Sequence, residues 1–222
     1  MTTHSRYALY YTAPGTDLAQ RGADWLGWDI ATGQSVTPSV GPEAGVQTPR
    51  KYGFHGTLKP PFRLAEGAEA SDLFVAARAL AADIQPFEIP ALRVNLLGSF
   101  LALTTEPNPP LAALAGACVT SIDAFRAPPS EAELARRRSK GLSERQESLL
   151  AAWGYPYVLE EFKFHLTLTG RTEKAERADI LEKARAHFEP CLRAPHTIEA
   201  ITLCGEREDG RFEEIEVLPL GR

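Results

Sequence analysis

The chain has 222 residues, of which 44% are hydrophobic and 24% charged, with a formal net charge of −5 and a pI near 5.6. This length suits one compact body or two small fused lobes, and no stretch reaches the ~18 uninterrupted apolar residues that a membrane-spanning helix needs. The acidic balance disfavours long nucleic acid as a partner, because binding along nucleic acid depends on many clustered cations.

The first half of the chain alternates strands and helices. Aromatic residues predict a strand over 5–12, the Gly- and Pro-rich stretch 32–49 reads as loop, and a short strand follows over 52–58. Ser71 is placed to cap a helix whose apolar residues keep helical spacing until Pro86. Two strands then fit 87–105, with their turn at Gly98.

The second half opens with a helix that Asn108 caps and Pro128 ends. Two capping-box signatures, which start at Ser130 and Ser143, predict a helical hairpin inserted over 127–156. The remaining elements that we expect are a strand over 162–169, a helix from Thr172 to about Phe188, and strands over 197–204 and 211–218.

Both halves contain a histidine-bearing strand, then a helix, a proline stop and two strands. We therefore predict a single bilobal domain over 1–222, with lobe 1 at about 13–105, lobe 2 at about 106–222, and the strand 5–12 able to exchange between them. The three cysteines, an odd number without close spacing, argue against a disulfide framework and a thiolate metal site; they are Cys118, Cys191 and Cys204. With no secretory signal pattern at the start, we expect a cytoplasmic protein.

One five-residue pattern occurs twice: Phe-His-x-Thr-Leu, at 54–58 and again at 164–168. A single His-x-Thr is more often a core histidine bonded to a carbonyl, and 5 histidines among 16 threonines give roughly 0.4 such matches by chance. Two copies with the same flanking residues favour function. In a strand, His55 and Thr57 share one face, as do His165 and Thr167, while the Phe and Leu side chains point to the core.

Two histidines suit displacement at phosphorus. One imidazole can deprotonate the attacking water and the other can protonate the leaving oxygen, because the ordinary pKa of histidine, about 6.5, lies close to neutral pH. Threonine hydroxyls can donate to the non-bridging oxygens, and this chemistry requires no metal.

These motifs make the chain resemble the two-histidine (2H) phosphoesterase superfamily. The wider stretches 52–62 and 153–170 are similar to a branch of bacterial proteins associated with phosphonate metabolism. The resemblance implies an α+β fold of two pseudo-symmetric lobes, each an antiparallel sheet with helices on its outer side, around a central cleft. It also implies a metal-independent cyclic phosphodiesterase without a cofactor, with a ribosyl 1,2-cyclic phosphate as the candidate substrate.

Strand alternation and chain proximity nominate residues for substrate binding around the motifs. These are Lys59, Lys163, Lys51, Thr169, Arg171 and Arg137, the last within the basic run Arg136–Arg138 on the inserted hairpin. This run fits a solvated helix face or a lid over the cleft, and the sequence does not decide between them. Tyr10, Tyr7 and Trp28 are candidates for stacking on a base or sugar, although a core role suits each of them better.

Two other functions stay open. A non-catalytic nucleotide or RNA-end binding protein would use the same cleft without turnover. A metal hydrolase would need a His-Glu-x-x-His or similar spacing, which the sequence lacks. The sequence does not indicate which histidine is the acid, which ring bond opens, or the oligomeric state.

Overall fold

The computed structural model describes residues 4–42, 45–139, 141–193 and 195–222. Within these ranges, seven strands form one antiparallel sheet in the order β11-β10-β1-β4-β8-β7-β6. In that order the strands are Phe212–Pro219, Ala200–Glu206, Tyr7–Tyr11, Gly56–Phe62, His165–Thr167, Phe100–Thr104 and Arg93–Leu97. Two short antiparallel pairs lie outside this sheet, namely β2 (Trp28–Asp29) with β3 (Gln34–Ser35) and β5 (Phe87–Ile89) with β9 (His196–Ile198).

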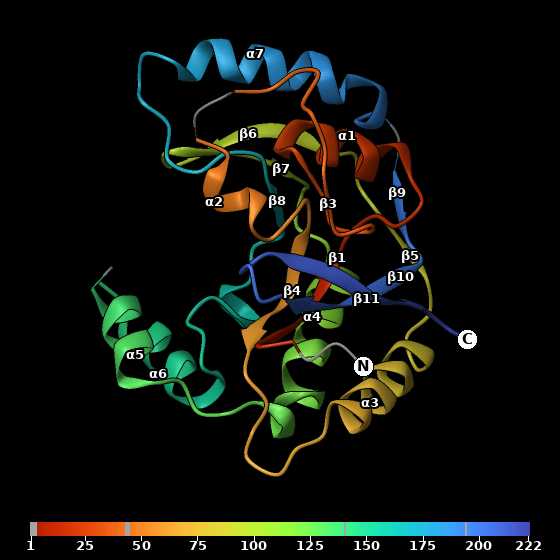
Figure 1. Cartoon of the computed structure of the whole chain (residues 1–222), viewed down its shortest axis with the longest axis vertical. Helices are drawn as coiled ribbons and strands as arrows, with labels where there is room; N and C mark the ends of the chain where they lie inside the picture. Colours follow the sequence, from red (N-terminus) through yellow and green to blue (C-terminus); the bar gives the residue numbers. More distant parts are fainter. Residues whose placement is uncertain (1–3, 43–44, 140, 194) are drawn as a thin grey trace.

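Helices gather at both ends of the sheet (Figure 1), which confirms the predicted α+β class. The α-helices are α1 Asp17–Leu26, α2 Gln47–Arg50, α3 Ala70–Ala82, α4 Pro109–Ser121, α5 Glu131–Arg138, α6 Glu144–Trp153 and α7 Arg177–Phe188. Short 3-10 turns occur at Asp123–Phe125, Leu159–Glu161 and Glu189–Cys191. In Figure 1, α1 and α7 lie at one end, α3 and α4 at the other, and α5 and α6 project to one side. Across the described ranges, none of the helices is long and apolar enough to cross a membrane.

The main core lies on one face of the sheet. Leu9, Leu58, Leu166 and Leu203 from four adjacent strands are at most 1% exposed and belong to one hydrophobic cluster, which also contains the buried faces of α3, α4 and α7. Because side chains alternate along a strand, the neighbours of these leucines point to the opposite face. That opposite face carries the polar residues of both motifs.

The sheet consists of two halves that meet between β4 and β8. In the described chain, the register between these strands consists of the pair Gly56↔Leu166, whereas β7 and β8 share three pairs and β1 and β10 share four. One half contains β1, β4, β10 and β11, and the other contains β6, β7 and β8. Each half therefore contains strands from both predicted lobes, those that precede residue 105 and those that follow it.

The helix caps follow local sequence closely. Asn108 accepts from Leu111 N, both predicted capping boxes form at Ser130 and Ser143, and Gly154 ends α6 in the left-handed region. Thr172 does not cap a helix as predicted, because its amide and its hydroxyl both donate to Ser99 O. Helix α7 begins only at Arg177.

Candidate active site

The two Phe-His-x-Thr-Leu motifs lie side by side at the centre of the sheet, on β4 and β8. In the described chain, β4 and β8 share the register pair Gly56↔Leu166. Gly56 lies between His55 and Thr57 in the sequence, and Leu166 lies between His165 and Thr167, so this pair brings the two motifs together. All four side chains line one cleft with a volume of about 680 Å³. The structure therefore has the paired arrangement that the resemblance to 2H phosphoesterases implies.

His55 is held by its neighbours in the chain and by Tyr10. Its Nδ1 lies 2.9 Å from Gly53 O and its Nε2 lies 3.1 Å from Thr57 Oγ1. Since a carbonyl oxygen can only accept, Nδ1 carries the proton, and Nε2 of the neutral ring is an acceptor. The Tyr10 ring stacks on the imidazole at 3.8 Å between centroids.

The surroundings of His55 favour its neutral form. Burial is the main cause that lowers the pKa of His55 to about 4, and the nearby His165 lowers it further, while the bond to Gly53 O opposes the shift. A histidine whose pKa falls on folding stabilises the folded state fully above its unfolded pKa of about 6.5. That contribution is lost as the pH falls toward about 4.

His165 repeats the hydrogen-bond pattern of His55. Its Nδ1 lies 2.8 Å from Lys163 O, again the carbonyl two residues earlier, and the Phe100 ring lies 5.9 Å from its ring. Both histidines therefore use Nδ1 to fix the ring and leave Nε2 as the nitrogen available to a ligand in the cleft.

The phenylalanine before each histidine packs closely on a glycine, which fixes the position of the backbone that carries the imidazole. A Cβ added at Gly22 of α1 would lie 2.0 Å from the Phe54 ring, and one added at Gly56 would lie 2.5 Å from the Phe164 ring. Gly53, whose carbonyl holds His55, has a φ of +71°, which side chains disfavour. The glycines thus allow the aromatic residues before each histidine to pack directly on the backbone.

The cleft has a basic and aromatic lining without acidic side chains. Among the described residues, its walls contain four arginines, and none of the lining residues is Asp or Glu. Besides the motif residues and Thr169, the lining consists of Arg6, Arg136, Arg137, Arg171, Tyr10, Tyr52, Tyr155, Phe100, Thr48, Pro49, Pro60, Pro61 and Gly170. Within the described ranges, no group of three or more His, Cys, Asp or Glu could hold a metal ion. The lining suits an anionic ligand.

Lys59 does not face the cleft, contrary to the prediction from alternation. The register between β1 and β4 shifts from Tyr10↔Thr57 to Leu9↔Lys59, so a bulge at Leu58 moves Lys59 to the opposite face. The Lys59 side chain is 2% exposed; its Nζ donates to Val119 O at 2.8 Å and pairs with Asp123 at 3.2 Å. Burial lowers the pKa of Lys59 from its ordinary value.

The other nominated lysines also lie outside the cleft lining. Lys163 and Lys51 are exposed, and they contribute carbonyl oxygens that accept from His165 and from the Phe212 amide. Strand β8 begins only at His165, so alternation does not place Lys163 on the cleft face. Both side chains are therefore outside the lining, and their role in binding substrate stays a prediction.

The remaining nominated residues do reach the cleft. Tyr10, Arg137 and Arg171 line it, and Thr169 lines it with a hydroxyl that accepts from Leu101 N at 2.9 Å. The hairpin of α5 and α6 brings Arg136 and Arg137 to the cleft. Their role in binding stays a prediction.

Several lining residues were not foreseen from the sequence: Arg6, Tyr52, Phe100 and Tyr155. Arg6 forms an ion pair with Glu206 and lies over the Phe212 ring at 5.6 Å. The signal available for Tyr52 and Tyr155 was their place near the two motifs, in the stretches that carried the family resemblance.

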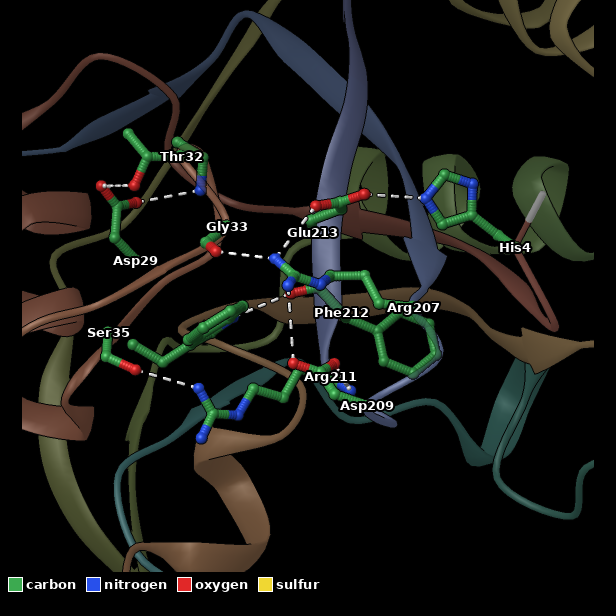
Figure 2. Close-up of polar contacts among 12 residues, drawn as sticks. His4, Asp29, Thr32, Gly33, Ser35, Arg207, Asp209, Arg211, Phe212 and Glu213 are labelled. Atoms are coloured by element: carbon green, nitrogen blue, oxygen red, sulfur yellow. Dashed lines mark hydrogen bonds and ion pairs between the residues drawn. The ribbon is translucent and has the colours of Figure 1, made fainter. Parts of the chain in front are cut away.

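Tyr7 and Trp28 belong to the core, the role that suited them better. Tyr7 packs in the main core, and Trp28 is 2% exposed and donates to Phe212 O at 2.8 Å. Figure 2 shows the polar contacts around this position, in which Arg207 donates to Gly33 O at 2.7 Å and Arg211 to Ser35 Oγ at 3.0 Å.

These contacts fix the start of β11, whose Phe212 packs on the aromatic residues next to His55. Phe212 is fully buried, its ring stacks with Tyr52 at 5.4 Å, and it lies 5.9 Å from the ring of Tyr10. Because Tyr10 in turn stacks on His55, the aromatic residues form a continuous support behind the imidazole.

A family described as "Protein of unknown function (DUF1045)" matches residues 57–213. Two curated relatives are named Ribose 1,5-bisphosphate phosphokinase PhnN. The protein from Janthinobacterium sp. (strain Marseille) is 39% identical over 97% of this chain and 51% of its own length. The protein from Laribacter hongkongensis (strain HLHK9) is 34% identical over 92% of this chain and 49% of its own length. The chain thus spans about half the length of these relatives.

Solved structures similar to the chain include TT0787 of Thermus thermophilus, with a TM-score of 0.48, 15% identity, and coverage of 97% of this chain and 98% of that one. E. coli LigT complexed with NADP+ has a TM-score of 0.48 and 12% identity over 100% of both chains. The family match at residues 57–213 spans well over half of the sequence, so the chain belongs to the DUF1045 family.

Proposed function

We propose that the chain hydrolyses a cyclic phosphodiester on a small phosphorylated sugar or nucleotide, as a 2H-type phosphoesterase without a metal. The observation that carries this proposal is the shared geometry of the two histidines. Each bonds through Nδ1 to the carbonyl two residues earlier, which leaves Nε2 for a ligand, and both histidines line one basic cleft together with Thr57 and Thr167.

In the proposed reaction, His55 is the general base and His165 the general acid. His55 suits the base because burial keeps it neutral, with a pKa of about 4. Water attacks phosphorus and gives its proton to His55 Nε2, while one ring P–O bond breaks and its oxygen takes a proton from His165 Nε2. The product is a phosphomonoester with a free hydroxyl.

In this scheme Thr57 and Thr167 also donate hydrogen bonds to the phosphate. In the free protein the Thr57 hydroxyl lies 3.1 Å from His55 Nε2, to which it donates. When a phosphate enters, this hydroxyl turns to a non-bridging oxygen, and Thr167 serves a second oxygen from the opposite strand. The lone pair of His55 Nε2 then becomes available to water.

Two facts favour a ribosyl substrate and a place in phosphonate metabolism. The sequence resembles a branch associated with phosphonates, and the relatives named above act on ribose 1,5-bisphosphate by their names. Ribosyl 1,2-cyclic phosphate is therefore the candidate substrate, and we expect the reaction in the cytoplasm.

A panel of cyclic phosphates with excess EDTA tests the proposed function. The panel includes ribosyl 1,2-cyclic phosphate and nucleoside 2′,3′-cyclic phosphates, with release of the monoester followed by ³¹P NMR. The wild-type protein should convert at least one of them, and the double variant H55A/H165A should convert none. Saturable binding without turnover would instead indicate the non-catalytic alternative.

Gly56→Ala should lower kcat/KM about 100-fold. The added methyl group would lie 2.5 Å from the Phe164 ring, so the ring would move and displace the neighbouring His165. Steady-state kinetics and thermal melting check this. The matched control is Gly116→Ala in α4, where the added methyl meets only Leu159 at 3.6 Å. Equal activity of both variants would show that this packing does not position His165.

A further inference from the structure

Unpaired polar atoms concentrate in the cleft. Among the described residues, three buried side-chain polar atoms have no hydrogen-bond partner, and two of them, Tyr10 Oη and Arg137 Nε, belong to residues that line the cleft. A buried donor without a partner costs about 1–3 kcal/mol. The proposed chemistry at His55 and His165 uses neither atom, so both are available to another part of a ligand.

The two donors belong to a cluster of residues that line the cleft near His55. The rings of Tyr10 and Tyr52 lie 3.8 and 6.2 Å from the His55 ring, and Arg137 lies over the Tyr155 ring at 4.5 Å. Burial raises the pKa of Tyr10 well above its ordinary value, so its hydroxyl keeps its proton and can donate. Tyr10 stacks on His55, so this cluster lies next to the proposed reaction centre.

The arginines of the hairpin differ according to the side they face. Arg138 and Arg145, which lie outside the cleft lining, form ion pairs with Glu147 and Glu160. In the described chain, the guanidinium groups of Arg136 and Arg137, which line the cleft, form no ion pair or hydrogen bond. Unneutralised arginines in a cleft without acidic side chains indicate an anionic ligand.

We infer that the substrate carries a second phosphate group, a terminal monoester, which Arg137 and the Tyr10 hydroxyl bind while Arg136 lies at the rim. This inference rests on the proposed function, because the first phosphate is the cyclic one between the histidines. A guanidinium and a phenol suit a monoester, whose several oxygens accept from both donors. The substrate class is thus a cyclic phosphodiester of a sugar that bears a further phosphate.

Matched substrate pairs test this inference. Ribose 1,2-cyclic phosphate and adenosine 2′,3′-cyclic phosphate are each compared with the derivative that carries a 5-phosphate or 5′-phosphate. The wild-type protein should prefer the phosphorylated member of at least one pair about 100-fold in kcat/KM, as expected for two charge-assisted hydrogen bonds. Arg137→Gln and Tyr10→Phe should each reduce this preference about tenfold.

Arg138→Gln is the matched control, since this neighbour lies on the same helix and pairs with Glu147 outside the cleft. It should leave the preference unchanged. The inference is overturned, and the proposed function kept, if the wild type hydrolyses both members equally or if Arg137→Gln lowers both activities by the same factor. A preference for adenosine substrates regardless of the 5′-phosphate would show base stacking instead.

A binding measurement separates the two proposals if no cyclic phosphate is hydrolysed. Calorimetry with ribose 5-phosphate should show binding to the wild type and about tenfold weaker binding to Arg137→Gln, with ribose as the blank. Such binding without turnover would support the phosphate subsite and overturn the hydrolytic function. Absence of both binding and turnover would overturn both.

Discussion

Replacing either His55 or His165 by alanine is expected to lower kcat/KM for the cyclic phosphate at least about 1,000-fold, because general acid and base catalysis each contribute about 10²–10⁴. Each variant removes one of the two Nε2 atoms that the proposed reaction uses. The double variant should be little worse than either single variant, because groups that act as a unit are not additive. Single-turnover kinetics in EDTA measure the chemical step directly.

His196→Ala is the matched control for these substitutions. His196 lies in β9, outside the cleft lining, and its replacement should leave kcat/KM within about threefold. If the His55 and His165 variants kept wild-type rates while melting normally, the assignment of this cleft as the catalytic site would be refuted.

The pH profile separates the roles of the two histidines. If His55 is the base, kcat/KM should hold from neutral pH downward and decline only near its pKa of about 4, because only the neutral ring accepts a proton. An acidic limb at about 6.5, the ordinary pKa of histidine, would contradict this assignment. Rates measured at constant ionic strength, with melting curves at each pH, distinguish loss of activity from loss of fold.

Lys59→Ala is expected to lower the free energy of unfolding by about 3 kcal/mol, because removal of one partner of a buried ion pair costs about 3–5 kcal/mol. The ammonium group bonds to Val119 O and Asp123 and thereby connects β4 to the end of α4. Asp123 keeps its bonds to Arg126 in the variant, which places the cost at the lower end. Urea unfolding followed by circular dichroism measures it.

Two controls separate this structural role from substrate binding. Lys59→Met keeps the length of the buried stem and should cost about half as much, and Lys163→Ala, at an exposed position, should stay within about 0.5 kcal/mol. Should Lys59→Met unfold like the wild type but raise KM for the cyclic phosphate, the lysine would bind substrate after all.

The site could be predicted from the sequence where local rules determine the structure. Alternation within Phe-His-x-Thr-Leu placed His55 and Thr57 on one face and buried Phe54 and Leu58, as the structure shows. Helix caps at Asn108, Ser130 and Ser143 also follow from a few neighbouring residues.

Features that depend on distant partners were not predictable in the same way. The position of Lys59 depends on a bulge that only the pairing of β4 with β1 reveals, since alternation alone put it in the cleft. Helix α1 was missed although its local signals, the Thr16 cap and the Gly27 end, are present; only the packing of its Gly22 against Phe54 depends on a distant partner. The partition of the sheet into halves likewise depends on which strands pair across the whole chain.

The register pair Gly56↔Leu166 is where the two halves of the sheet meet in the described chain, and each motif belongs to a different half. A ligand that contacts both histidines therefore acts as a noncovalent crosslink between β4 and β8, which share a single register pair in the described chain. Amide hydrogen exchange along β4 and β8 should slow when the cleft is filled, even for residues whose side chains point to the core. Ligand affinity and the stability of the pairing between β4 and β8 are thus thermodynamically linked.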